Sequence, residues 1–132
     1  MTKVLIIDDE EDITHNLNSI LKKNLTKDVK IAGSFSGAKE AIAGFAPDVV
    51  FLDVNLGDGN GYDLVPLIKK TTQTPPKIIM MSAYDGEKER QQVIEKGANL
   101  FMQKPFTKED ILSSLQKVGI LKGVQTDDSN KF

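Results

Sequence analysis

The sequence predicts an α/β domain built on a doubly wound, five-stranded, mostly parallel sheet. Short apolar runs bounded by turn residues alternate with helical segments five times along 132 residues, a length that suits one domain. Such runs fit strands buried on both faces, and helical crossovers between them imply parallel pairing. Four of the five runs finish in polar residues. Because the carboxyl ends of parallel strands meet at one edge, a functional site is expected there.

Two strand–helix units precede the central strand. Residues 3–7 are continuously apolar and lead into the acidic run 8–12, which suits the first turn of a helix because the helix dipole favours negative charge there. Residues 29–35 are predicted to form a weaker strand. Ser36 is expected to cap the next helix, which ends before Pro47.

The same alternation continues from the central strand, residues 49–53. The elements expected after it are a glycine-rich loop over 57–61, a helix over 62–70, a strand over 77–82, a helix over 87–96, a strand over 99–103 and a last helix capped by Thr107. Core-facing residues expected in two of these helices are Leu64, Leu67 and Ile68, and Ile111, Leu112, Leu115 and Val118. We predict one domain over residues 1–119 and a flexible tail or the start of a linker over 120–132.

The composition excludes several kinds of site. There is no cysteine, so disulfides and thiolate chemistry are excluded, and a single histidine, His15, excludes a histidine-rich metal centre. A net charge of −2 with mixed signs argues against nucleic-acid binding through bulk electrostatics. No apolar run reaches the length of a membrane span, and the acids at 8–12 are unlike a signal peptide. A cytoplasmic protein is therefore expected.

The polar residues at the strand ends have complementary chemistry. They are Asp8, Asp9, Asp53, Ser82 and Lys104. Crowded carboxylates need a cation, and hard oxygen ligands suit Mg²⁺. A hydroxyl and an ammonium beside them can bind the oxygens of a phosphoryl group, and a carboxylate can accept that group as an aspartyl phosphate. The combination predicts metal-assisted phosphoryl transfer centred on Asp53.

Each of these residues also has a purely structural interpretation. Asp8 and Asp9 would cap the first helix, and Asp53 would start the turn before the glycine-rich loop. Ser82 alone would begin a turn, and Lys104 alone would be a surface residue with a buried stem. The chemical interpretation depends on the joint pattern, in which every residue lies at the same end of its own strand.

In this order, the strand-end residues resemble the receiver domain of two-component response regulators. The matching motifs, within about residues 3–117, are Asp8-Asp9, Asp53, Ser82-Ala83 and Lys104-Pro105. The resemblance implies a flavodoxin-like, CheY-like (βα)5 fold with strand order 2-1-3-4-5. It also implies a phosphoacceptor switch, phosphorylated by a sensor histidine kinase or a histidine phosphotransfer protein. Such a domain is no turnover enzyme, and its activity is limited to self-phosphorylation and slow autodephosphorylation.

The resemblance assigns roles to individual residues. It implies that Asp53 is phosphorylated and that Mg²⁺, with Mn²⁺ as a substitute, is bound by Asp8, Asp9, Asp53 and the backbone carbonyl of Asn55. It implies that Ser82 and Lys104 bind the phosphate and that Ser82 and Phe101 form the switch. It also implies a cis peptide bond before Pro105. Asn55 and Tyr84 occupy variable positions expected to tune the lifetime of the phosphorylated form. The output surface is expected over Glu87–Val118, facing an effector domain, a downstream protein or a second copy of the chain.

Three other functions compete with this interpretation. A phosphohydrolase of the haloacid dehalogenase type also uses an aspartate nucleophile, but Asn55 stands where that family needs a second aspartate. A calcium-binding loop starting at Asp53 would have Asp58 in place of its glycine and Leu64 in place of its last glutamate. A flavodoxin-like electron carrier would share the fold, but the carboxylates would repel a flavin phosphate.

Overall fold

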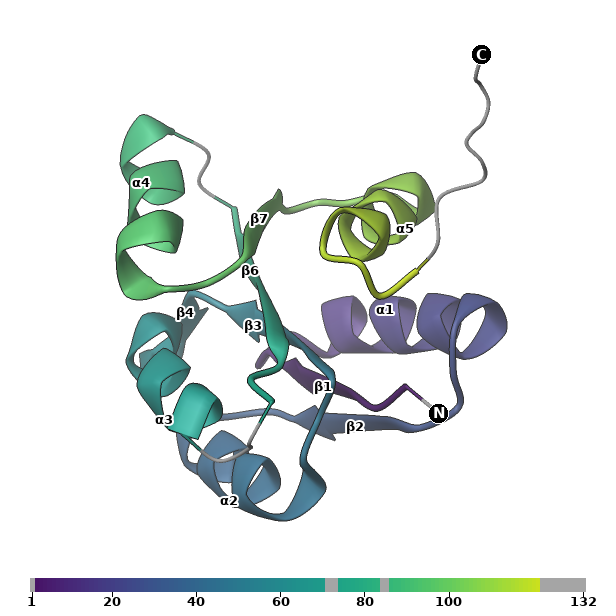
Figure 1. The fold of residues 1–132 in the computed structure, drawn as a ribbon, viewed down its shortest axis with the longest axis horizontal. Coiled ribbons are helices and arrows are strands. Elements are labelled where there is room, and N and C mark those ends of the chain that lie inside the picture. Colours follow the sequence, from purple (N-terminus) through teal and green to yellow (C-terminus); the bar gives the residue numbers. More distant parts are fainter. Residues whose placement is uncertain (1, 71–73, 84–85, 122–132) are drawn as a thin grey trace.

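A computed structural model describes residues 2–70, 74–83 and 86–121. Its main sheet has five parallel strands in the order β2-β1-β3-β6-β7, with a two-stranded antiparallel hairpin beside it (Figure 1). The strands are β1 Val4–Ile7, β2 Val29–Ala32, β3 Val49–Asp53, β6 Lys77–Ser82 and β7 Leu100–Gln103, and those of the hairpin are β4 Asn55–Leu56 and β5 Gly59–Asn60. Numbered within the main sheet, the strand order is the predicted 2-1-3-4-5.

Helices cover both faces of this sheet. They are α1 Glu11–Asn24, α2 Phe35–Phe45, the 3-10 helix η1 Gly61–Leu64, α3 Val65–Lys70, α4 Glu87–Lys96 and α5 Lys108–Lys117. The helices α2, α3 and α4 lie on one side, and α1 and α5 lie on the other (Figure 1). None of the helices in the described ranges is long and apolar enough to cross a membrane.

The central strand β3 contributes side chains to both cores. Val50 and Leu52 pack toward α2, α3 and α4, whereas Val49 and Phe51 pack toward α1 and α5. All four are fully buried. Helices on both faces explain why the strand is continuously apolar, as parallel sheets require. Asp53, the last residue of β3, lies where this apolar run reaches the edge of the sheet.

The boundary between β2 and α2 differs from the prediction. The strand ends at Ala32 and Phe35 is already helical, so the expected strand over 29–35 was too long. The N-cap is Ser34, whose hydroxyl accepts a hydrogen bond from the N–H of Gly37 at 2.9 Å; Ser36 is not the cap. A second cap comes from Asp58, whose carboxylate accepts from the N–H groups of Phe35 and Ser36 at 2.7 and 3.2 Å. Asp58 lies 23 residues from Phe35, so local sequence patterns do not indicate this contact.

The segment after β3 is more ordered than predicted. The expected loop over 57–61 contains part of the β4–β5 hairpin, and the expected helix over 62–70 is divided into η1 and α3. Pro66 lies in the first turn of α3, where its missing N–H leaves no helical acceptor unpaired. Leu67, predicted to face the core, is 37% exposed, and Leu112 is only half-buried.

The hydroxyl of Tyr62 is buried without a hydrogen bond to any described residue, which lowers the stability of the fold. The side chain is 4% exposed, and its Oη has no hydrogen-bond partner among the described residues. Burial raises the pKa of the Tyr62 phenol. Tyr62→Phe is therefore expected to raise the free energy of unfolding by about 1 kcal/mol, because the unfolded chain hydrates the hydroxyl and the fold does not. Chemical denaturation measures this. A loss of 1 kcal/mol or more in the phenylalanine variant would contradict it.

Candidate functional site

The carboxyl edge of the sheet brings the predicted site residues together. Asp8 follows β1, Asp53 and Ser82 end β3 and β6, and Lys104 follows β7. These four residues are at most 9% exposed. A backbone hydrogen bond holds two of them side by side, since the N–H of Lys104 donates to the carbonyl of Ser82 at 2.8 Å. A cleft of about 200 Å³ opens above them, lined by Glu10, Asp53, Asn55, Ser82, Ala83 and Lys104.

The ammonium of Lys104 lies at the centre of a group of carboxylates. Its Nζ is 2.6 Å from Glu10 Oε1, 2.8 Å from Asp8 Oδ2 and 3.3 Å from Asp53 Oδ1. The contact with Asp8 is an ion pair without the alignment of a hydrogen bond, so Asp8 Oδ2 is buried without an aligned donor among the described residues. One cation thus offsets several negative charges, two of which, on Asp8 and Asp53, are buried.

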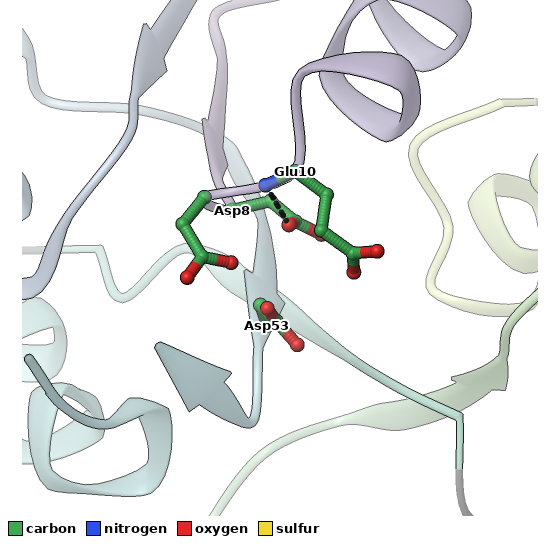
Figure 2. Close-up of side chains that lie close together, drawn as sticks. Asp8, Glu10 and Asp53 are labelled. Atoms are coloured by element: carbon green, nitrogen blue, oxygen red, sulfur yellow. Dashed lines mark hydrogen bonds between the residues drawn. The ribbon is translucent and has the colours of Figure 1, made fainter. Parts of the chain in front are cut away.

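Four acidic side chains converge in this space. Carboxylate oxygens of Asp8, Asp9, Glu10 and Asp53 lie within 4.8 Å of one another. Figure 2 shows Asp8 and Glu10 reaching from the turn between β1 and α1 toward Asp53 at the end of β3. Backbone N–H groups orient them: Asp8 Oδ1 accepts from Glu10 at 2.9 Å, and Asp9 Oδ2 accepts from Gly57 at 3.0 Å. The arrangement is an acidic cluster of oxygen ligands.

Burial and neighbouring charge change the acidity of the site. Burial, and next the charge of Asp8, raise the pKa of Asp53 to about 6, with Lys104 acting in the opposite direction. Burial alone would lower the pKa of Lys104, but its contacts with Asp8 and Glu10 raise that pKa above its ordinary value. At neutral pH the site therefore combines an ionised Asp53 with a permanently charged Lys104.

The remaining predicted residues lie at different distances from this cluster. Asn55 is exposed in β4 and lines the cleft. The peptide bond between Lys104 and Pro105 is cis, as the resemblance implied. Phe101 lies in β7 beside Met80, is half-buried, and packs against the core on the side of α2, α3 and α4. Tyr84 is outside the described residues.

Glu10 is a site residue that sequence analysis did not single out. It was assigned only to the acids at the start of the first helix. In the structure Glu10 is the N-cap residue of α1, yet its side chain makes no capping hydrogen bond and instead contacts Lys104. Its position directly after Asp8 and Asp9 could have indicated that Glu10 belongs to the site. Its partner lies 94 residues away, so the contact itself was not predictable from local sequence.

Comparison with known proteins identifies the family. Residues 4–116 match the model of the response regulator receiver domain. The sensory transduction protein LytT of Bacillus cereus is 36% identical over 89% of this chain and 47% of its own length, and protein PilG of Pseudomonas aeruginosa is 32% identical over 86% of this chain and 84% of its own. The chain thus spans about half the length of LytT.

A solved structure agrees in fold. The chemotaxis protein CheY4 of Vibrio cholerae superposes with a TM-score of 0.81 at 26% identity, covering 89% of this chain and 98% of that one. This similarity, together with the strand order of the main sheet, confirms the predicted flavodoxin-like architecture. The sequence match, the relatives and the fold lead to one conclusion: this chain belongs to the response regulator receiver domain family, a family of signalling domains in two-component systems.

Proposed function

We propose that Asp53 is the phosphoacceptor of a two-component phosphorelay, phosphorylated by a sensor histidine kinase or a histidine phosphotransfer protein. The observation that carries the proposal is the position of its carboxylate. It ends the central strand, lines an open cleft, and lies 3.3 Å from the ammonium of Lys104. A carboxylate in such a place is a nucleophile with a positive charge beside it.

The reaction transfers one phosphoryl group. A carboxylate oxygen of Asp53 forms a bond to phosphorus while the phosphorus–nitrogen bond of the donor phosphohistidine breaks, and the imidazole nitrogen keeps the electron pair and takes a proton. Lys104 and the hydroxyl of Ser82 bind the phosphoryl oxygens. Because this chemistry needs little beyond positioning and neutralisation of charge, a lysine and a hydroxyl at the strand ends suit it.

The acidic cluster fits a divalent cation. The ligands we propose are the carboxylates of Asp8, Asp9 and Asp53 and the backbone carbonyl of Asn55. An all-oxygen donor set suits Mg²⁺, with Mn²⁺ as a substitute, and Asp8 Oδ2 has no aligned hydrogen-bond donor to give up. The bound ion would neutralise charge on the phosphoryl oxygens.

The response to phosphorylation is proposed to reach the face over Glu87–Val118. A dianion on Asp53 adds charge-assisted hydrogen bonds to Ser82 and Lys104, and Phe101 two residues before the end of β7 would repack. The helix α4 is weakly anchored, since Val93 is its buried residue and Ile94 is 79% exposed. The occupant of this face would be an effector domain, a downstream protein or a second copy of the chain.

Treatment with phosphoramidate and Mg²⁺ tests the proposal. We expect intact mass to show one added phosphoryl group, and EDTA to prevent its addition. The group should then be lost slowly, at a rate that Asn55 and Tyr84 tune, and Tyr84→Ala should change that rate severalfold. Rapid release of many equivalents of phosphate would instead indicate the phosphohydrolase, although Asn55 stands where that enzyme needs an acid.

Lys104 should have opposite effects on stability and on metal affinity. Lys104→Met leaves Asp8 and Asp53 buried without their cation, so we expect the metal-free protein to lose about 2–4 kcal/mol of unfolding free energy. The same change should tighten Mg²⁺ binding, because the ion no longer competes with an ammonium. Denaturation and calorimetric titration measure the two effects. Lys27→Met, at an exposed lysine, is the control. The prediction would be contradicted if both variants had the same unfolding free energy and the same Mg²⁺ affinity.

A further inference from the structure

The contact between Glu10 and Lys104 is the shortest that the lysine makes. It measures 2.6 Å, against 2.8 Å to Asp8 and 3.3 Å to Asp53. An ammonium has three N–H donors and no more. Three carboxylates therefore surround the ammonium, and its hydrogen bond goes to Glu10, so a phosphoryl oxygen that binds Lys104 competes with Glu10 for this donor.

The three carboxylates are not equally easy to replace. The side chains of Asp8 and Asp53 are 0% and 5% exposed, whereas that of Glu10 is 58% exposed. Releasing a buried carboxylate from its cation is costly, but an exposed one returns to water at little cost. Glu10 is therefore the partner that Lys104 gives up when a phosphoryl oxygen needs a donor.

The backbone holds Glu10 where it can make this contact. Its N–H donates to Asp8 Oδ1 at 2.9 Å, which fixes the turn between β1 and α1. Its side chain is not used as a helix cap and points into the space shared with Asp8 and Asp53 (Figure 2). The side chain thus has one ordered task among the described residues, the ion pair with Lys104.

We infer that Glu10 is a positioning residue that holds Lys104 in the unphosphorylated state and competes with the incoming phosphoryl group for it. The inference rests on the proposed phosphorylation of Asp53. Glu10 slows phosphorylation through the lysine, and it is distinct from the residues proposed to bind the metal. Removing its carboxylate frees one N–H donor of Lys104 for the phosphoryl oxygen.

The rate of phosphorylation tests this inference. With phosphoramidate at saturating Mg²⁺, we expect Glu10→Gln to be phosphorylated about threefold to fivefold faster than the unchanged protein, the size of a partly screened ion pair. Glu11→Gln removes the same charge one residue later, from an exposed side chain in the first turn of α1, and should leave the rate within about twofold. An unchanged rate in Glu10→Gln overturns the inference.

The variant Glu10→Asp distinguishes an effect of the contact with Lys104 from an effect of the negative charge at residue 10. Glu10→Asp keeps the charge but lacks one methylene, and aspartate is favoured as a helix cap, so its carboxylate should leave Lys104 for the backbone of α1. We expect it to be phosphorylated faster, as Glu10→Gln is. If Glu10→Asp is as slow as the unchanged protein, the charge repels the donor directly and the inference is wrong. A loss of Mg²⁺ affinity of tenfold or more in Glu10→Gln would make Glu10 a metal-site residue and overturn it too.

A measurement without phosphate distinguishes failure of this inference from failure of the proposed function. In the metal-free protein, the side-chain ammonium of Lys104 is observed by ¹⁵N NMR, and Glu10→Gln should speed its hydrogen exchange with water whereas Glu11→Gln should not. If no variant is phosphorylated but this exchange accelerates, the phosphoacceptor proposal fails and the Glu10 contact stands. If phosphorylation proceeds normally and neither rate nor exchange changes, the Glu10 inference alone fails.

Discussion

Replacing Asp53 with asparagine is expected to abolish phosphorylation and to stabilise the metal-free protein at neutral pH. The amide has nearly the shape of the carboxylate but lacks a nucleophilic oxygen anion, so intact mass after treatment with phosphoramidate and Mg²⁺ should show no added group. Asp53→Asn also removes a buried negative charge that lies beside Asp8. Asp63→Asn, at an exposed residue of η1, should be phosphorylated normally. Stoichiometric phosphorylation of Asp53→Asn would contradict the assignment.

The stability gain should depend on pH in a defined direction. In the fold the pKa of Asp53 is raised to about 6, above its ordinary value of 3.8, so between these values the native state binds more protons than the unfolded chain. Stability contributed by the protonated Asp53 is therefore lost as pH rises through this window. The advantage of Asp53→Asn over the unchanged protein should grow from pH 4 to pH 7 to roughly 1–2 kcal/mol, allowing for solvent in the cleft. Denaturation at several pH values without metal measures it, and an advantage that shrinks over this range would contradict it.

Gly61→Ala should be the most destabilising single methyl addition near the site. A Cβ at Gly61 would lie 1.9 Å from the carbonyl oxygen of Asp53, far inside van der Waals contact. The obstacle is backbone, and the N–H of Gly61 donates to the carbonyl of Val54 at 2.7 Å, so neither segment can shift freely. We expect a loss of about 3 kcal/mol or more in unfolding free energy and impaired phosphorylation, because the end of β3 must move.

Another glycine of the chain provides a matched control. Gly44 lies exposed near the end of α2, and a Cβ there meets nothing within 4 Å. Gly44→Ala should raise stability by about 0.5–1 kcal/mol, since alanine has the higher helix propensity. Thermal and chemical denaturation of both variants compare the effects. A Gly61→Ala protein as stable as the unchanged chain would show that the strand end adapts.

The features that sequence predicted best are those set by short-range patterns. The capping box of α5, in which Thr107 and Asp110 exchange side-chain and backbone hydrogen bonds, lies within four residues and was recognisable as a motif. The polar strand ends were equally accessible, because parallel topology brings them to one edge whatever their separation in sequence. Fold and the position of Asp53 followed from these two kinds of pattern.

The features that sequence missed depend on distant partners. Ser34 rather than Ser36 caps α2, and Asp58, in the turn of the β4–β5 hairpin, accepts from the N–H groups of the next two residues. Leu67 has the helical spacing of a core residue, but η1 interrupts the helix and changes the face it presents. Glu10 contacts a lysine 94 residues away, so its role required the geometry of the whole sheet edge.

The two sides of Asp53 differ in how firmly the neighbouring segments are anchored. On one flank the β4–β5 turn is tied down twice, by Gly57 to the carboxylate of Asp9 and by Asp58 to the start of α2. On the other flank α4 buries only Val93. We expect the structure to resist a movement of Asp53 toward the hairpin and α2, where these hydrogen bonds would have to break. A movement toward α4 disturbs fewer buried contacts. We therefore expect a displacement at Asp53 to be transmitted mainly toward α4.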